Sequence, residues 1–384
     1  MKRLGAMVVI LVLIMGCLPV CVNAVELNIP AKAAVLMDAA TGTVLYEQNA
    51  HTALPPASVT KIMTMLLIME AIDSGRIGWE DTVTASESAA AKGGSQIYLK
   101  VGETMPVSTL LKSVAVSSAN DAACALAEHI AGSESAFVDM MNTRAKELGM
   151  ENTHFVNCTG LDDEESAKEH KTSAYDIALM SRQLLLHHPD IKKYTTIWMD
   201  TIRDGSFGLS NTNKLVRFYQ GATGLKTGYT SLAGFCLSAS AQRDGMELIA
   251  VVLGCDTSAV RFAACKSMLD HGFAAYGLIT PQMDEGVTVP VRLGEKREVP
   301  VVLSGENALL IDKAQKNSVT THIELSEEVT APVSRGQRLG TMTVKSGEQI
   351  LAEIPLTAAE PVGRLRWGDL FLKMLRSLCM SERG

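Results

Sequence analysis

The sequence has no block of basic residues, and this absence excludes one large class of partners. Lys and Arg together number 35 against 42 Asp and Glu, which gives a formal net charge of −7. A nucleic-acid backbone is bound by clustered Lys and Arg side chains, because neutralising its phosphates supplies most of the affinity. We therefore expect no nucleic-acid partner. With 384 residues, 47% of them hydrophobic, the chain is long enough to form more than one domain.

Metal-binding patterns of cysteine and histidine are also absent. The chain has eight cysteines, but no two form a C-x-x-C pair and no histidine cluster accompanies them. Most lie in apolar segments such as DAACALA and FCLSASA, where a buried free thiol is the simpler interpretation. The sequence therefore predicts neither a metal site nor a cofactor. Beyond the first 24 residues, the cysteines are Cys124, Cys158, Cys236, Cys255, Cys265 and Cys379.

Aromatic residues and cysteine are missing from residues 277–366. Segments of alternating hydrophobicity recur there instead (VTVPVRL, VPVVL, THIEL, GTMTV and ILAEIPL), separated by Gly, Pro and charged residues. Alternation with a period of two predicts β-strands. We expect a small all-β domain at residues 278–360, with a spacer or packing role because it offers no candidate nucleophile.

The two ends of the chain have patterns of their own. Residues 1–24 begin with Lys2 and Arg3, continue as an apolar stretch and end in Val-Asn-Ala, which predicts a signal peptide cleaved after Ala24. The alternative is an uncleaved membrane anchor. The sequence thus predicts an exported protein.

Residues 361–384 predict an amphipathic helix. A basic polar face opposite Trp, Phe and Leu is typical of a helix that lies in the headgroup region of an anionic membrane, and charges interrupt the apolar residues too often for a span. The alternative is a helix that docks on the β-domain. The apolar face would carry Trp367, Leu370, Phe371, Met374, Leu375 and Leu378, and the polar face Arg366, Asp369, Lys373 and Arg376.

Residues 25–277 mix helix and strand signals, which predicts an α/β (α+β) domain. We expect two strands around a turn at Thr41-Gly42 and a helix from Ser58 to about Gly75. Two buried helices should meet around 117–121, and an amphipathic helix should end at Gly149. Residues 224–255 are interpreted as two neighbouring strands that turn at 243–245.

The predicted helix at Ser58 carries an unusual pair. After Lys61 the run is almost purely apolar, which is typical of a core helix. A serine at this place is most often a helix cap. However, residues three apart share a helix face, and burial lowers the pKa of a lysine. Lys61 could then act as a general base beside Ser58 as nucleophile.

Two further short motifs can be interpreted in more than one way. Ser118 and Asn120, in VSSANDAAC, suit an interhelix turn, or a hydroxyl relay and a hydrogen-bonding amide beside Lys61. The TGLKTGYT segment is no phosphate loop, because Leu225 replaces the glycine required before the lysine. On a strand, Lys226 and Thr227 could hold a substrate carboxylate while Gly228 lets the substrate approach the backbone. Lys226 would also help to lower the pKa of Lys61.

Ser-x-x-Lys, Ser-x-Asn and Lys-Thr-Gly, in this order, resemble the signature of penicillin-binding proteins and serine β-lactamases. Longer segments resemble the low-molecular-mass D-alanyl-D-alanine carboxypeptidases over residues 25–276, and the β-domain with a terminal helix is also that family's layout. These segments are LPPASVTKIMT, GGSQIYLKVGE, SSANDAACALAEHIAGS, NTHFVNCTGLDD and GLKTGYT. Cys158 stands where this family frequently has proline.

The resemblance implies a β-lactamase/transpeptidase-like fold and a substrate, the peptidoglycan stem peptide ending in D-Ala-D-Ala. It implies Ser58 as nucleophile, Lys61 as base, Ser118 as proton relay and β-lactams as covalent inhibitors. The oxyanion hole would use the backbone N–H groups of Ser58 and Tyr229. Arg261 would face the substrate carboxylate, although a surface arginine is the alternative.

The resemblance also places His170 and Asp176 in a family segment, where we expect supporting roles. It implies action at the outer face of the cytoplasmic membrane.

Two other functions share these motifs. A class A β-lactamase needs a glutamate that activates the deacylating water. No glutamate near residues 151–169 lies in the expected E-x-x-x-N setting. A non-catalytic penicillin sensor or wall-binding module would not need Ser58, Lys61, Ser118, Asn120 and Lys226 together.

Overall fold

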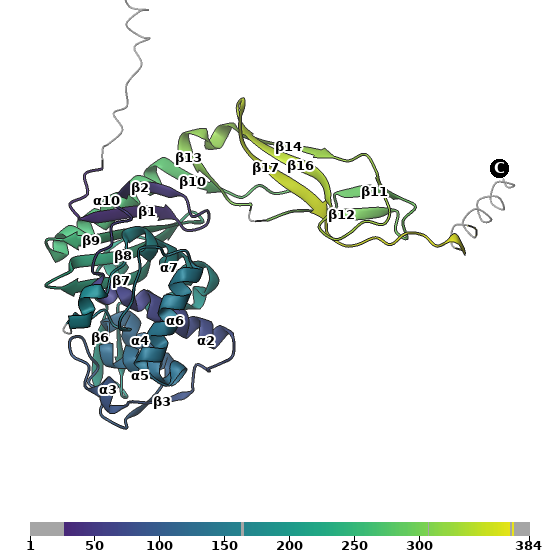
Figure 1. The fold of residues 1–384 in the computed structure, drawn as a ribbon. Helices are drawn as coiled ribbons and strands as arrows, with labels where there is room; N and C mark the ends of the chain where they lie inside the picture. The colour runs from purple at the N-terminus through teal and green to yellow at the C-terminus, as the bar shows by residue number, and fades with distance from the viewer. Residues whose placement is uncertain (1–26, 163–164, 306, 369–370, 372–384) are drawn as a thin grey trace, which may run out of the picture.

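The computed structural model describes residues 27–162, 165–305, 307–368 and 371. The predicted signal peptide and most of the predicted terminal helix lie outside these ranges. Figure 1 shows two parts, a larger one with helices on both faces of a sheet and a smaller elongated one made of strands. This mixed α/β domain followed by an all-β region confirms the predicted fold class.

A five-stranded antiparallel sheet with the order β2-β1-β9-β8-β7 forms the centre of the larger part. Both of its faces are buried, so apolar side chains of the central strands point alternately to one face and the other. In β1, Val35 packs against the helices on one face and Leu36 against α10 on the other. The strands are β1 (Ala33–Asp38), β2 (Val44–Gln48), β7 (Ala222–Thr230), β8 (Gly234–Arg243) and β9 (Met246–Cys255).

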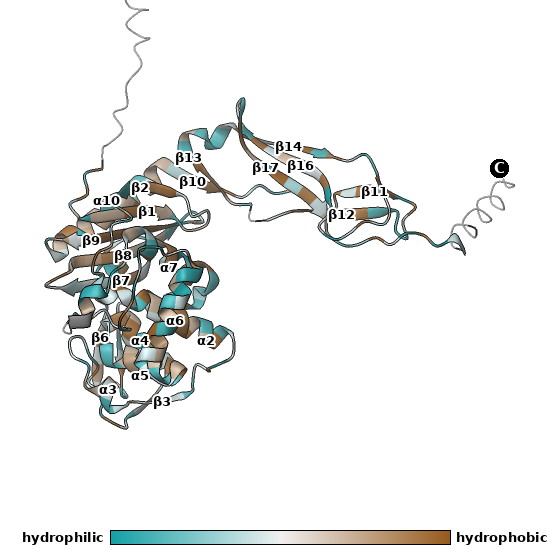
Figure 2. Ribbon diagram, viewed as in Figure 1, coloured by the Kyte–Doolittle hydropathy of each residue, from teal (hydrophilic) through white to brown (hydrophobic). Residues whose placement is uncertain are grey.

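Helices cover both faces of this sheet. Helix α10 packs on β8 and β9, whereas α7 packs on β1 and β9 from the other face. Figure 2 shows hydrophobic residues on the strands and on the inward helix faces. The helices are α2 (Lys61–Asp73), α3 (Glu87–Ala90), α4 (Val107–Ser117), α5 (Asn120–Ala131), α6 (Glu134–Glu147), α7 (Ala174–His187), α8 (Lys192–Thr195), α9 (Leu215–Phe218) and α10 (Ser258–Ala275).

Short elements connect these units. They are the 3-10 turns η1 (Ala57–Thr60), η2 (Glu165–Glu169), η3 (Pro189–Ile191) and η4 (Lys313–Ser318), and two small hairpins, β3 (Thr82–Thr84) with β4 (Thr104–Pro106) and β5 (Met199–Ile202) with β6 (Phe207–Ser210).

The smaller part is a six-stranded sheet with its own apolar core. Its strands are β14 (Val319–Leu325), β16 (Arg338–Ser346), β17 (Gln349–Ala358), β12 (Glu298–Leu303), β11 (Thr288–Arg292) and β15 (Val329–Thr330), in this spatial order. A separate two-stranded sheet of β10 (Tyr276–Ile279) and β13 (Leu309–Asp312) lies where the two parts meet (Figure 1).

Most of the predicted elements are confirmed, with one correction. Helix α5 ends at Gly132 in a left-handed conformation, and α6 is followed by Gly149 with φ of 72°. Residues 224–255, however, belong to three strands, because the segment that contains Lys226 forms β7 and pairs with β8. The predicted turn at 243–245 joins β8 to β9.

Candidate active site

Ser58 and Lys61 lie together at the start of α2. Ser58 is in the 3-10 turn η1, which leads directly into the helix, so the two side chains are three residues apart on one face. The Lys61 ammonium nitrogen donates to Ser58 Oγ at 2.8 Å and to the Thr159 carbonyl at 2.8 Å. Both partners are oxygen acceptors, which fixes the lysine beside the hydroxyl.

Burial changes the acid–base properties of Lys61. The side chain is fully buried, since α2 runs through the core. Burial lowers the pKa of Lys61 to about 7, although Cys158 and Asp121 act in the opposite direction. A lysine with this pKa exists partly as the neutral amine at neutral pH, as a general base requires.

Lys226 lies close enough to Lys61 for the two ammonium groups to repel each other. The pKa of Lys226 is lowered, first by burial and then by repulsion from Lys61 and Arg261. At Lys61, burial is the largest cause of the lowered pKa. The repulsion places the Lys-Thr-Gly motif beside the Ser-x-x-Lys motif, and the predicted effect of Lys226 on the pKa of Lys61 stays a prediction.

Two glycines allow the backbone to approach the turn at Ser58. A Cβ at Gly228 would lie 2.7 Å from the Pro56 carbonyl oxygen and 3.1 Å from the Ser58 nitrogen. A Cβ at Gly160 would lie 1.9 Å from the Ala57 carbonyl oxygen. Gly228 thus makes room for η1 in the structure, and its role beside a substrate stays a prediction.

Ser118 and Asn120 occupy the junction of α4 and α5. Ser118 is the C-cap of α4, with φ of 65°, and is buried. Among the described residues, its hydroxyl makes no hydrogen bond. Asn120 donates its amide to the Gly93 carbonyl at 2.7 Å, while its buried Oδ1 has no partner. A buried acceptor without a partner is unusual and is suited to a ligand N–H.

Strand β7 carries the remaining predicted residues and lies at one edge of the sheet. Lys226 donates to the Thr227 carbonyl at 2.9 Å, and the Thr227 hydroxyl donates to Thr212 at 2.7 Å. The side chain of Tyr229 is 57% exposed and stacks on Phe235. The predicted role of Tyr229 in the oxyanion hole uses its backbone N–H rather than this exposed ring.

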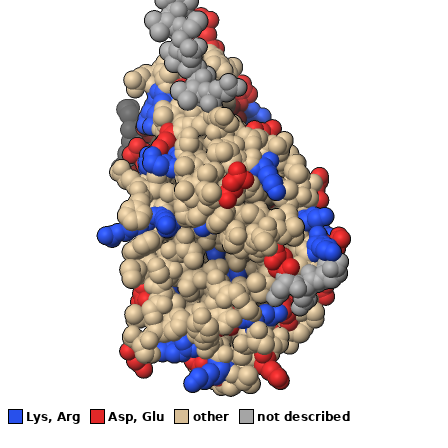
Figure 3. Space-filling model, turned by 90° about the vertical axis from the view of Figure 1, so that its left-hand side faces the viewer, with Lys and Arg blue, Asp and Glu red and all other residues tan. Residues whose placement is uncertain are grey.

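Arg261 is buried, in contrast to the surface alternative. Its guanidinium donates to the Gly228 carbonyl at 2.8 Å and to the Cys236 carbonyl at 3.3 Å, whereas its Nε has no partner. Arg261 therefore lies against the strand that holds the Lys-Thr-Gly motif. In Figure 3, which turns the left-hand side of Figure 1 toward the viewer, Lys and Arg atoms are visible in a hollow near the middle of the face.

Several contributors were not predicted from the sequence. The carbonyls of Thr159 and Gly93 hold Lys61 and Asn120. They lie in segments that resemble the family, but any residue type can supply a backbone carbonyl, so the sequence does not indicate this role.

His170 has the supporting position that was expected. It accepts from the Val156 N–H through Nδ1 and contacts the Thr60 hydroxyl through Nε2 at 2.7 Å. Burial lowers the pKa of His170 to about 3, so it is a neutral supporting residue.

Asp176 also has a supporting position. It accepts from the Asn152 N–H and the Thr153 hydroxyl, at 2.9 and 2.7 Å.

The Ser58 site thus consists of a hydroxyl, a lysine of lowered pKa and surrounding residues that are held by hydrogen bonds. The described residues also include one group with metal-ligand chemistry, Cys124, Glu134 and Cys158.

A family comparison decides the assignment. Residues 21–257 match the D-alanyl-D-alanine carboxypeptidase family (Peptidase_S11). The chain belongs to this family. Residues 279–364 match the C-terminal domain of penicillin-binding protein 5. The resemblance carried by the three motifs is confirmed.

Curated carboxypeptidases and solved structures agree with the family. The chain is 45% identical to D-alanyl-D-alanine carboxypeptidase DacF of Bacillus subtilis, with 87% of this chain and 86% of DacF covered. It is 35% identical to DacC of Escherichia coli, with 87% and 85% covered. Penicillin-binding protein 5 of Haemophilus influenzae superposes with a TM-score of 0.74 at 31% identity, with 88% and 98% covered.

Proposed function

We propose that the chain is a serine-type D-alanyl-D-alanine carboxypeptidase with Ser58 as nucleophile. Ser58 Oγ attacks the carbonyl carbon of the penultimate D-alanine while neutral Lys61 takes the hydroxyl proton. The observation that carries this proposal is the 2.8 Å hydrogen bond between Lys61, with its pKa of about 7, and Ser58 Oγ. No histidine is needed for activation.

The tetrahedral intermediate carries a negative oxygen, which the backbone N–H groups of Ser58 and Tyr229 stabilise in this proposal. Such donors act on charge that is absent from the ground state, so they lower the barrier selectively. Ser118 passes a proton to the leaving nitrogen, and free D-alanine departs. Water then hydrolyses the acyl-enzyme.

Substrate recognition is assigned to the edge strand and its neighbours. An extended peptide can add to an unpaired sheet edge, and β7 offers one. The unpartnered Oδ1 of Asn120 would accept a substrate N–H. Lys226, Thr227 and Arg261 supply positive charge and a hydroxyl for the terminal carboxylate.

β-Lactams would acylate the same serine. Penicillin-binding protein D2 of Listeria monocytogenes, solved with ampicillin bound, superposes with a TM-score of 0.59 at 34% identity. This chain covers 99% of that structure, while 65% of this chain is covered.

The location of the enzyme is a further part of the proposal. We infer export by a signal peptide at 1–24, a catalytic domain at 25–277, a β-rich domain at 278–360 and a membrane-surface helix at 361–384. The described part of that tail supports the last assignment, since Trp367 is 89% exposed and Phe371 is 65% exposed. Among the described residues, no helix is long and apolar enough to cross a membrane.

The test is release of D-alanine from a diacetylated tripeptide that ends in D-Ala-D-Ala. The wild-type protein should release one D-alanine per peptide and convert many peptides per enzyme molecule. Ser58→Ala should release none. The same peptide with a terminal L-alanine is the control and should be a poor substrate. Rapid turnover of penicillin without any D-alanine release would instead favour a β-lactamase.

A further inference from the structure

Three potential metal ligands meet behind the active site. Cys124 lies on α5, Glu134 is the first residue of α6, and Cys158 lies in the loop that precedes Thr159. Their ligand atoms all lie within 4.8 Å of one another. Both cysteines are fully buried, whereas the Glu134 side chain is 18% exposed. Residues 34 positions apart in the sequence therefore form one cluster.

The Glu134 carboxylate contacts both thiols. Glu134 Oε1 is 3.2 Å from Cys158 Sγ, and Oε2 is 3.8 Å from Cys124 Sγ. The Cys158 N–H also donates to Oε1, which fixes the orientation of the carboxylate. Two sulfurs and a carboxylate oxygen around one point correspond to a ligand set that Zn²⁺ and similar thiophilic ions accept.

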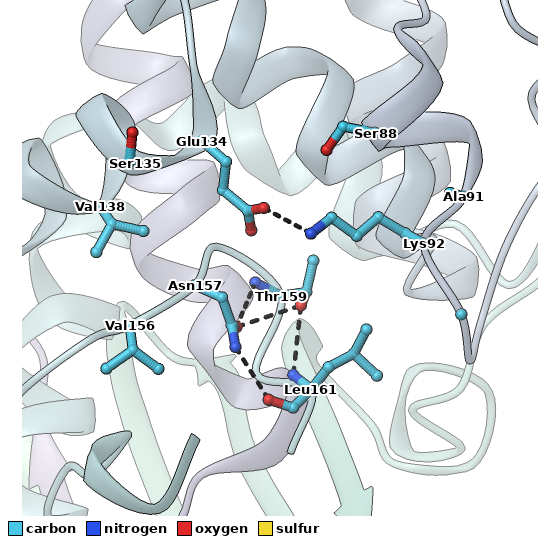
Figure 4. Close-up of a pocket in the computed structure, with 11 residues that line it drawn as sticks. Ser88, Ala91, Lys92, Glu134, Ser135, Val138, Val156, Asn157, Thr159 and Leu161 are labelled. Carbon is cyan, nitrogen blue, oxygen red and sulfur yellow. Dashed lines mark hydrogen bonds and ion pairs between the residues drawn. The ribbon is translucent and has the colours of Figure 1, made fainter. Parts of the chain in front are cut away.

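A pocket of about 420 Å³ borders this cluster on the Glu134 side, and neither cysteine lines it. Figure 4 shows Glu134 and Lys92 facing each other across this pocket, with an ion pair of 2.6 Å between them. Lys92 is 22% exposed, so its ammonium can move outward and leave room beside the carboxylate. The pocket thus gives solvent access to the carboxylate side of the cluster, where a water molecule would serve as fourth ligand.

We propose that Cys124, Glu134 and Cys158 bind a thiophilic divalent cation of the Zn²⁺ class. Each thiol loses its proton on binding, and each thiolate forms one bond to the metal. The cluster carries one negative charge before binding, from the carboxylate. It also carries one afterwards, because two thiolates offset the two charges of the cation. Lys92 can therefore remain nearby as the counter-ion.

Metal binding by thiols is linked to proton release. A bound zinc ion deprotonates a coordinating thiol outright. Binding would release protons, which can be measured independently of any enzymatic activity.

The metal site would be coupled to the nucleophile through the peptide link from Cys158 to Thr159 and the hydrogen bonds of Lys61. The carbonyl of Cys158 accepts from Thr64, and the carbonyl of the next residue, Thr159, accepts from Lys61. Gly93, beside Lys92, holds Asn120. Metal binding would tighten the 157–159 loop and change the rate of Ser58 acylation. This last point rests on the proposed function, whereas the binding itself does not.

The experiment is titration of the reduced, untagged, full-length protein with Co²⁺ under anaerobic conditions. We expect one Co²⁺ per chain with a thiolate-to-cobalt charge-transfer band, and Zn²⁺ should abolish the band by displacement. Cys124→Ala and Cys158→Ala should lose the band, and Glu134→Gln should weaken binding by about ten-fold or more. The matched control is Cys265→Ala, which removes another buried thiol and should retain the full band.

A measurement on the unmodified chain keeps the proposal falsifiable if a cysteine variant misfolds. X-ray absorption of the zinc-loaded wild-type protein should show two sulfur ligands at about 2.3 Å with nitrogen or oxygen ligands at about 2.0–2.2 Å. A shell without sulfur, a band that persists in Cys158→Ala, or no band at all would overturn the site.

Discussion

At the scale of single residues, Lys61 is the group whose protonation should control the reaction. Its pKa of about 7 predicts that acylation accelerates as the pH rises through about 7, because only the neutral amine accepts the Ser58 proton. Stopped-flow acylation by a fluorescent penicillin would give the second-order rate at each pH. A rate that does not change between about pH 5 and about pH 9 would contradict this role.

Lys61→Arg separates charge from basicity. Arginine keeps the positive charge but does not deprotonate in proteins, so acylation should fall by about 10³-fold or more while the fold persists. Circular dichroism would report the fold and penicillin labelling the rate. Near wild-type labelling by Lys61→Arg would rule out the general-base assignment.

The same lysine should reduce the stability of the fold in a pH-dependent way. Its folded pKa of about 7 lies below the ordinary 10.5, so the unfolded chain binds more protons between these values. The cost of burial is complete below about pH 7 and decreases as the pH rises toward 10.5. Lys61→Met should therefore raise the free energy of unfolding by about 2–4 kcal/mol near pH 6 and by less near pH 10. Urea unfolding at both pH values checks this, and a gain that is larger at pH 10 would contradict it.

Position 160 requires a glycine for two reasons: its backbone conformation and the closeness of its neighbours. Its φ is +79°, and an added Cβ would lie 1.9 Å from the Ala57 carbonyl oxygen. Gly160→Ala should cost about 2–4 kcal/mol and displace the turn at Ser58, which slows acylation. Gly75 is the matched control, because its φ is +72° with no atom within 4 Å of the added Cβ. Gly75→Ala should cost about 1 kcal/mol and leave acylation unchanged. Equal effects of the two substitutions would show that close packing at Gly160 is unimportant.

At the scale of elements, Asp121 joins α5 to the segment that precedes β4. Its fully buried carboxylate accepts from the backbone N–H groups of Ile97 and Leu99, at 3.0–3.2 Å. Asp121→Ala would leave these donors unpaired and should cost about 2–4 kcal/mol. Asp121→Asn keeps one acceptor oxygen and should cost less. Urea unfolding of both variants would measure these costs. A decrease in the free energy of unfolding below about 0.5 kcal/mol for Asp121→Ala would contradict the account.

The sequence predicted the local part of the site better than the long-range part. Ser58 and Lys61 are neighbours on one helix face, so their contact follows from spacing alone. The carbonyl of Thr159 lies 98 residues away from Lys61 along the chain, and any residue type could supply it. Tertiary packing, rather than spacing, also brings Cys158 to Cys124.

The same distinction between local pattern and long-range packing explains which strands were predicted correctly. Alternation in residues 278–360 predicted the main strands of the β-domain. One face of β11 and β12 is buried there, whereas β14 has no buried residue. Strand β7 was not separated from β8, since Gly, Lys and Thr within it do not give a regular pattern. Its role as an edge strand depends on the whole sheet.

At the scale of the whole molecule, we propose that the tail determines where the enzyme acts. Liposome flotation of the mature protein on phosphatidylglycerol-rich vesicles should bring the full chain to the lipid fraction, because Trp367 and Phe371 insert while basic residues meet the headgroups. Removal of the residues after Pro361 should abolish flotation. The double variant Trp367→Ala/Phe371→Ala, which keeps the charges, should reduce it strongly. If the truncated and full-length proteins float equally, the tail is not the anchor.

The central claim is that Ser58 is the acylated nucleophile. Its most direct test is mass spectrometry of the protein after treatment with penicillin, followed by peptide mapping. We predict a single covalent adduct on the peptide that contains Ser58, and no adduct in Ser58→Ala, which should remain folded. An adduct of the same mass in Ser58→Ala, or one that maps to another serine in the wild-type protein, would contradict the account.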